Sequence, residues 1–115
     1  MKKNNQIPED YLEKIPARAE GLGWSVDENG AVTLELENKG AFNKIAQKLL
    51  KKPKVSYIHL DENGSFVWQQ IDGESDILKI GESVKDHFGE KAEPIYPRLS
   101  QFIRTLETYH FITFK

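Results

Sequence analysis

Apolar and polar residues alternate on both sides of a turn-forming stretch, Asp27-Glu-Asn-Gly30. Alternation with a period of two is typical of a strand with one buried face, and an Asn-Gly pair between two such runs favours a hairpin. The pattern therefore predicts a β-hairpin over Trp24–Leu36, with Ser25, Thr33 and Glu35 facing water. The residues predicted to face the core are Trp24, Val26, Val32, Leu34 and Leu36.

The middle of the chain combines a strand with the helix that follows it. β-branched and aromatic residues over Val55–Leu60 predict a short strand. Asp61 is predicted to be the N-cap of the helix that follows, because its carboxylate can accept hydrogen bonds from the free N–H groups of the first turn. Apolar residues at helical spacing, Trp68 among them, then predict a helix over 61–71. Gly73 can take the positive φ that ends such a unit.

Another helix is predicted between the hairpin and this strand, over residues 38–54. Pro53 prevents its continuation. Its lysines fall on the exposed side or near the C-terminus, as either a solvated face or a basic patch for an acidic peptide or nucleic acid. Its apolar stripe consists of Phe42, Ile45, Ala46 and Leu49.

The next amphipathic helix is predicted over 75–88. Ser75 is the expected N-cap, and Gly89 can end the helix. Gly81 lies in the interior, where glycine costs about 1 kcal/mol relative to alanine. A glycine at that position indicates that a second helix approaches closely.

A last helix is predicted over 95–109. Pro94 and Pro97 are tolerated only in a first turn, so they mark its beginning. Residues 111–114 form either a final short strand or an apolar tail over the core. The buried stripe of the helix is predicted to be Ile95, Leu99, Phe102, Ile103 and Leu106.

These elements predict an α+β fold with a winged-helix-like layout. A three-stranded antiparallel sheet carries three C-terminal helices on one face, and a further helix is inserted between strands 2 and 3. Residues 1–15 are expected to form a flexible N-terminal arm, and residues 16–115 a single domain.

Composition limits the classes of protein that fit. The 115 residues include no cysteine, which excludes disulfides and thiolate metal sites and suits a cytoplasmic protein. No apolar segment follows the basic start, so no signal peptide is expected. Nothing approaches the roughly 20 apolar residues of a membrane span, so no membrane partner is expected. Residues 39–60 carry six lysines and no acid, yet the whole chain has a net charge of -2.

No catalytic or cofactor-binding motif is present. His59, His87 and His110 have no metal-ligand spacing, so no metal is expected. The acids pair with no histidine or serine in a catalytic frame, and the glycines form no phosphate loop. We therefore expect a protein that is not an enzyme and has no cofactor. Trp24 and Trp68 are expected in the core rather than as platforms for a ligand.

An unpaired sheet edge is the remaining candidate for function. A three-stranded sheet has two edges, and strand 55–60 is expected to be one of them. Its N–H and C=O groups can template an added strand from another peptide. The alternative is that a helix or the N-terminal arm covers this edge.

The central stretch resembles the signature of the PqqD family. In that family a strand ends in Leu-Asn/Asp-x-x-Gly/Ala, followed by Ile/Val-Trp and then Asp-Gly, as in Leu60-Asp61-Glu-Asn-Gly64-Ser-Phe-Val67-Trp68-Gln-Gln-Ile71-Asp72-Gly73. Pro16, Arg18 and Trp24 resemble its opening Pro-x-Arg and Trp. The helix-like insertion at 38–54 is longer than the connection in short members.

The resemblance implies a recognition element for ribosomally made precursor peptides. Such a winged-helix-like protein is not catalytic and presents the peptide to a modifying enzyme, a radical-SAM protein in the pathway to pyrroloquinoline quinone (PQQ). We therefore predict that a leader segment adds as a strand to this edge and lies against the last helix. The predicted peptide-binding residues are Val55, Tyr57, Ile58, His59, Arg98, Gln101 and Thr105.

Three alternatives use the same elements. A winged-helix nucleic-acid binder would use the lysines of 39–54, but residues 61–93 hold nine acids and three lysines, which argues against a basic recognition helix there. A general protein-interaction subunit would bind only a large partner. A homodimer could also form through the edge strand.

Overall fold

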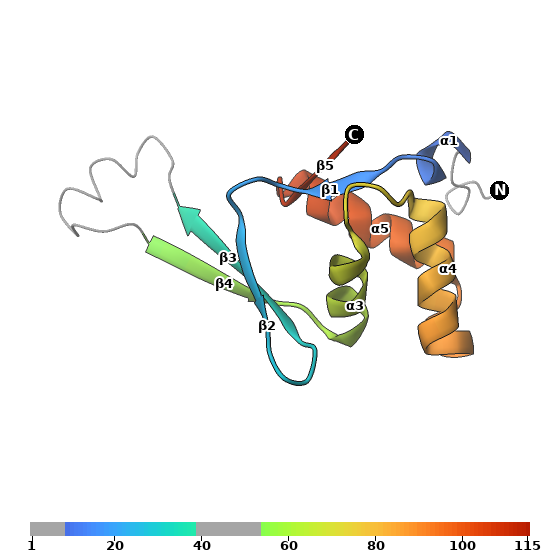
Figure 1. Ribbon diagram of the computed structural model, residues 1–115, viewed down its shortest axis with the longest axis horizontal. Coiled ribbons are helices and arrows are strands. Elements are labelled where there is room, and N and C mark those ends of the chain that lie inside the picture. Colours follow the sequence, from blue (N-terminus) through green and yellow to red (C-terminus); the bar gives the residue numbers. More distant parts are fainter. Residues whose placement is uncertain (1–8, 39–53) are drawn as a thin grey trace.

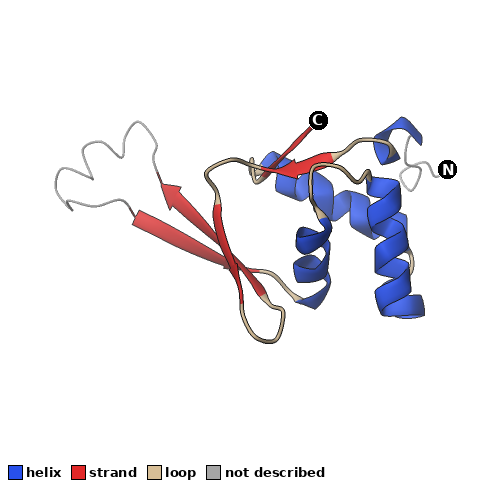
Figure 2. Ribbon diagram, in the orientation of Figure 1, coloured by secondary structure: helices blue, strands red, loops and turns tan. Residues whose placement is uncertain are grey.

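A computed structural model describes residues 9–38 and 54–115 of the chain. Figure 1 labels the elements, and Figure 2 separates helices from strands. In chain order the elements are α1 (Glu9–Leu12), β1 (Pro16–Arg18), β2 (Gly23–Val26), β3 (Val32–Asn38), β4 (Lys54–His59), α3 (Glu62–Gln70), α4 (Ile77–Phe88), the 3-10 helix η2 (Gly89–Ala92), α5 (Ile95–Thr108) and β5 (Ile112–Phe114).

The predicted hairpin is confirmed as the antiparallel pair β2 and β3. The Asp27 carboxylate closes the turn by accepting from the backbone N–H groups of Asn29 and Ala31, at 2.8 and 2.9 Å. Gly30 has a φ of +85°, a conformation that favours glycine. The turn residues of the sequence thus fix the hairpin through a side-chain bond and a positive φ.

The predicted central strand completes the sheet as β4. The sheet is antiparallel with strand order β2-β3-β4, and Leu34 of β3 lies opposite Ile58 of β4. The predicted helix over 38–54 falls almost wholly on residues 39–53, outside the described part of the chain. Its two outermost residues, Asn38 and Lys54, belong to β3 and β4 instead.

The inward face of the hairpin is buried less completely than the alternation predicts. Val32 and Leu34 are fully buried, whereas Trp24 and Leu36 are only partly buried. Val26 is 41% exposed, so its predicted place in the core is wrong. Val26 ends β2 next to the hairpin turn, and the alternation of a strand does not show how much of its inward face the rest of the molecule covers.

A second, two-stranded sheet was not predicted. β1 pairs antiparallel with β5, and Ala17 lies opposite Thr113. Of the two expectations for residues 111–114, the strand is therefore the correct one. Two further hydrogen bonds connect the N-terminal segment to the rest of the structure. The Lys115 N–H donates to the Ile15 carbonyl at 2.9 Å, and the Ile77 N–H donates to the Lys14 carbonyl at 3.1 Å.

The predicted helix over 61–71 is confirmed as α3. Its N-cap is Asp61, whose Oδ1 accepts from the Gly64 N–H at 2.7 Å. Gly73 follows the helix with a φ of +78°. Trp68 is fully buried, as predicted, and its ring meets that of Trp24 edge-on with centroids 6.0 Å apart.

The helix predicted over 75–88 forms as α4, with a different N-cap. Asp76 caps it by accepting from the Lys79 N–H at 2.8 Å, so the assignment of Ser75 is wrong. The Ser75 N–H instead donates to the Asp72 carboxylate in the preceding turn, at 2.9 Å. Gly89 ends the helix with a positive φ, as predicted.

The close approach predicted at Gly81 is confirmed. The ring of Tyr96, in the first turn of α5, occupies the place where a Cβ on Gly81 would lie. The Tyr96 hydroxyl donates to the Leu78 carbonyl at 3.0 Å, and burial raises the pKa of this hydroxyl. The predicted stripe of α5 is buried at four positions, and Phe102 is partly buried.

The helices do not pack equally on the sheet. All three were expected to cover one face, whereas Figure 1 shows α3 beside the sheet and α4 on the far side of α3. The core is therefore one continuous cluster in which α3 lies between the sheet and α4. Its largest fully buried side chains are Trp68, Leu34, Ile71, Ile77, Ile80, Ile103, Ile112, Val32 and Pro16.

Candidate functional site

The β4 strand forms an edge of the three-stranded sheet. Among the described residues its one strand neighbour is β3. The Leu60 N–H donates to the Val32 carbonyl at 2.9 Å, which sets the phase of the antiparallel ladder. Residues an odd number of positions from Leu60 are therefore expected to point their N–H groups away from β3. In β4 these include Tyr57 and His59.

The two faces of β4 have different surroundings. Ile58 shares the face of its partner Leu34 and packs against the core. Tyr57 and His59 share the opposite face with Glu35 and Thr33, and Tyr57 is 60% exposed. The His59 Nδ1 lies 3.0 Å from the Thr33 hydroxyl. A strand added here would alternate between a core-side face and a solvent-side face.

A buried serine ends the ladder between β3 and β4. Ser65 of α3 is 2% exposed, and its Oγ accepts from the Val32 N–H at 2.8 Å. The same hydroxyl donates to the Leu60 carbonyl at 3.2 Å. It thus bridges two backbone groups that would otherwise pair directly and joins the sheet to α3. Sequence reasoning missed Ser65, although a serine in the first turns of a helix that directly follows a strand is a usable signal.

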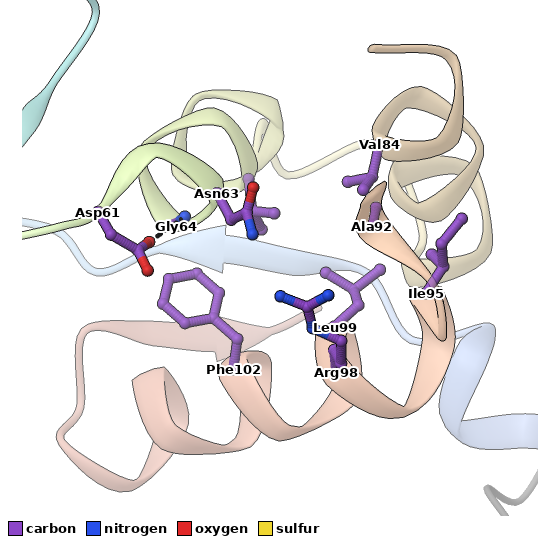
Figure 3. A pocket seen from close by; sticks show the side chains of 10 residues that line it. Asp61, Asn63, Gly64, Val84, Ala92, Ile95, Arg98, Leu99 and Phe102 are labelled. Carbon is purple, nitrogen blue, oxygen red and sulfur yellow. Dashed lines mark hydrogen bonds between the residues drawn. The ribbon is translucent and has the colours of Figure 1, made fainter. Parts of the chain in front are cut away.

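A pocket of about 180 Å³ lies where the beginning of α3 faces α5. Figure 3 shows Asp61 and Phe102 at one end, Val84 and Ala92 toward the other, and the Arg98 guanidinium between them. Arg98 is exposed, so its guanidinium lies at the rim of the pocket. The lining residues are Asp61, Asn63, Gly64, Val67, Val84, Ala92, Ile95, Arg98, Leu99 and Phe102.

Gly64 brings α3 and α5 close together at one end of this pocket. A Cβ at this position would lie 3.1 Å from the Asp61 Oδ1 and 3.2 Å from the Phe102 ring. That spacing is too tight without a shift of one neighbour. The glycine of the central motif therefore has a structural reason, which is the contact between the helix N-cap and the Phe102 ring.

The residues predicted on α5 do not all share one surface feature. Arg98 lines the pocket, and its Nη1 lies 3.4 Å from each of the Lys91 and Glu93 carbonyls. Gln101 and Thr105 are exposed and are not among the lining residues. The Thr105 hydroxyl donates to the Gln101 carbonyl of its own helix at 2.9 Å. Of the predicted site residues, Tyr57, Ile58 and His59 therefore lie on the β4 edge and Arg98 lines the pocket, whereas Gln101 and Thr105 belong to neither. Val55 belongs to β4, and its side chain is outside the described part of the structure.

Arg18 has a structural role at the opposite end of α3. Its guanidinium donates to the carbonyls of Trp68 and Gln69 at 3.3 Å and lies 4.5 Å from the centre of the Trp24 ring. Burial lowers the pKa of Arg18, while the Asp72 carboxylate acts in the opposite direction. The guanidinium thus satisfies two carbonyls at the C-terminus of α3.

Neither a metal-binding cluster nor a membrane-spanning helix is found in the described part of the chain. Within residues 9–38 and 54–115, no three His, Cys, Asp or Glu side chains gather in a way that could hold a metal ion. In the same ranges no helix has the length and apolar character needed to cross a membrane. The His87 ring stacks on Phe66 with centroids 4.2 Å apart.

Comparison with known proteins gives a family match. Residues 31–112 match the model of a family described as coenzyme PQQ synthesis protein D, PqqD. The matched range runs from the hairpin turn through β3, β4 and the helices to the beginning of β5. No curated protein and no solved structure matches the chain.

Proposed function

This chain belongs to the PqqD family, and from that premise we propose that it binds a ribosomally made precursor peptide and presents it to a modifying enzyme. Membership implies a role in PQQ biosynthesis, and members of the family are non-catalytic accessory proteins. The finer proposal is a winged-helix-like peptide chaperone, formed by residues 16–115 with 1–15 as an arm. Its enzyme partner is a radical-SAM protein.

The edge strand β4 is the observation that carries this proposal. Added-strand recognition draws its affinity from main-chain hydrogen bonds, which an unpaired edge can supply without a particular side chain. From the hydrogen-bond phase and the register of the β3–β4 ladder, the Tyr57 and His59 N–H groups are expected to point away from β3. An added peptide strand needs an edge strand that is long enough for several main-chain hydrogen bonds, and β4 has six residues.

The proposed binding residues divide into backbone and side-chain contributors. Ile58 would form the apolar side of the binding surface, because it already packs against the core. Tyr57 and His59 would contact the peptide on the solvent side and remain accessible to the enzyme partner. Arg98, Gln101 and Thr105 would contact it from α5, and Val55 would begin the paired segment.

A second copy of the chain could occupy the same edge. Strand pairing between two β4 edges would produce a homodimer. The two occupants compete for the same N–H and C=O groups, so saturating peptide should dissociate such a dimer. Sedimentation with and without peptide distinguishes the two states.

A pair of proline substitutions tests the edge directly. Proline removes one N–H, so Tyr57→Pro should abolish peptide binding and leave the sheet paired, because edge strands tolerate proline where the N–H faces outward. Ile58→Pro removes an inward N–H and should unfold the sheet. Tyr57→Ala serves as the control for the side chain and should weaken binding only modestly.

The measurement is calorimetric titration with a precursor peptide encoded near this chain's own gene, alongside circular dichroism of each variant. Folded Tyr57→Pro protein that binds the peptide as tightly as the parent would contradict the proposal. A stable, folded Ile58→Pro variant would contradict the register.

A further inference from the structure

The pocket between α3 and α5 has the size and lining of a site for one side chain. Its floor is apolar, and Val67, Val84, Ile95 and Leu99 are each less than a tenth exposed. An apolar cavity of about 150 Å³ is known to bind benzene. A volume of about 180 Å³ therefore accommodates a phenyl ring or a branched aliphatic group.

The rim of the pocket offers a cation. Within the described residues, the hydrogen bonds of the Arg98 guanidinium are two long contacts from Nη1. Its Nε and Nη2 donors can therefore serve an incoming oxygen. Asp61 is the acid on the rim, and its Oδ1 already accepts from the Gly64 N–H at 2.7 Å. Charge complementarity at Arg98 thus favours a carboxylate, which the guanidinium can bind through two N–H groups.

The pocket begins where the β4 edge ends. His59 is the last residue of β4, and Asp61, two residues later, lines the pocket. Two residues of extended chain span at most about 7 Å. The Asp61 end of the pocket therefore lies within about 7 Å of the end of the edge strand, a distance that two further residues of a bound peptide could span.

We propose that this pocket binds one aromatic or branched apolar side chain of the precursor peptide, with an adjacent carboxylate on Arg98. The proposal rests on the proposed function for the identity of the peptide. It adds a sequence preference, an acidic residue next to a large apolar one, immediately after the segment that pairs with β4.

Small probes test the pocket independently of the edge. The probes are N-acetyl-Asp-Phe-amide, N-acetyl-Asp-Ala-amide and N-acetyl-Asn-Phe-amide, titrated into the full chain with labelled methyl groups and followed by NMR. The Asp-Phe probe should shift the methyl resonances of Val67, Val84 and Leu99. It should bind about tenfold more tightly than the Asp-Ala probe, because the phenyl ring is buried. The Asp-Phe probe should also bind about two- to fivefold more tightly than the Asn-Phe probe, because a solvent-exposed ion pair contributes that much to affinity.

Three variants complete the test. Ala92→Leu places a larger side chain in the pocket and should abolish binding of the Asp-Phe probe. Arg98→Gln should remove the preference for Asp over Asn and retain that for Phe over Ala. Arg104→Gln, the matched control, removes the same charge from the same helix outside the pocket and should change neither preference.

The outcomes separate this inference from the proposed function. Equal binding of the Asp-Phe and Asp-Ala probes, or no shift at the three methyl groups, would overturn the pocket. Equal loss of the Asp preference in Arg98→Gln and Arg104→Gln would overturn the assignment of Arg98. If the precursor peptide still shifts the backbone amides of Tyr57 and His59 in either case, the proposed function stands without the pocket. If the pocket binds its probe while no precursor contacts these amides, the proposed function alone is refuted.

Discussion

Removing the Ser65 hydroxyl should destabilise the junction between the sheet and α3. In Ser65→Ala the Val32 N–H loses its acceptor at 2.8 Å, and Val32 is fully buried. A buried donor left without a partner costs about 1–3 kcal/mol. Alanine regains roughly 0.5 kcal/mol, because it favours the helix more than serine does. We therefore expect a net loss of about 0.5–2.5 kcal/mol in the free energy of unfolding.

Urea denaturation followed by tryptophan fluorescence measures this loss, and amide hydrogen exchange locates it. The Val32 amide should exchange faster in the variant under conditions where the protein stays folded. Thr108→Ala is the matched control, because the Thr108 hydroxyl donates to the Arg104 carbonyl at 2.9 Å on an exposed face. That change should cost less than about 0.5 kcal/mol. An unchanged Val32 exchange rate, or equal stability of both variants, would refute the role of Ser65.

Three further predictions concern the core and the charge distribution. Trp68→Ala should cost about 3–5 kcal/mol in urea denaturation, because it empties a fully buried site, and Trp68→Phe should cost less; a loss below about 1 kcal/mol would show that the ring does not support the core. Gly81→Ala should destabilise the parent because its Cβ meets the Tyr96 ring, yet stabilise a Tyr96→Ala protein by about 1 kcal/mol; equal effects in both backgrounds would contradict this contact. Mixed-sequence duplex DNA should bind weakly at physiological salt, and sub-micromolar affinity with a steep salt dependence would favour the nucleic-acid alternative.

The elements that local chemistry specifies could be predicted from the sequence. The hairpin depends on Asp27 and Gly30, which act within four residues of each other, so the turn is visible in the chain itself. The same holds for the start of α3, whose N-cap Asp61 directly precedes it. The helix ends at Gln70 with Ile71 as its C-cap, and Gly73 takes its positive φ in the turn beyond rather than at the helix end. In each case the interaction that fixes the element joins near neighbours in the sequence.

The features that depend on distant contacts could not be predicted. β1 has three residues and begins with a proline, and only its pairing with β5, almost 100 residues later, makes it a strand. The choice of Asp76 over Ser75 as N-cap depends on the turn that the Asp72 carboxylate forms. The exposure of Val26, at the end of β2, depends on packing from outside the hairpin, which the alternation does not show. None of these is encoded in the period of the local pattern.

The candidate site was predicted in part for the same reason. The position of β4 at an edge follows from the number and order of the strands, and the structure confirms that order. The pocket needs the beginning of α3 and the middle of α5 to meet, which no local pattern shows. Arg98 was predicted from the family resemblance, which implies a peptide lying against the last helix, whereas the apolar floor beneath it emerges only from packing.

The edge, the pocket and the core are linked through one short stretch of chain. Residues 54–59 supply the edge strand, Asp61 and Gly64 line one end of the pocket, and Ser65 ties the last paired residue of the sheet to α3. Trp68, one turn of helix after Gly64, anchors this stretch in the core. Because β4, Asp61 and α3 follow one another directly in the chain, a peptide on the edge and a side chain in the pocket would bind to adjacent parts of one unit. The entropy of aligning the two contacts is then lost during folding rather than binding, which favours simultaneous occupation of both.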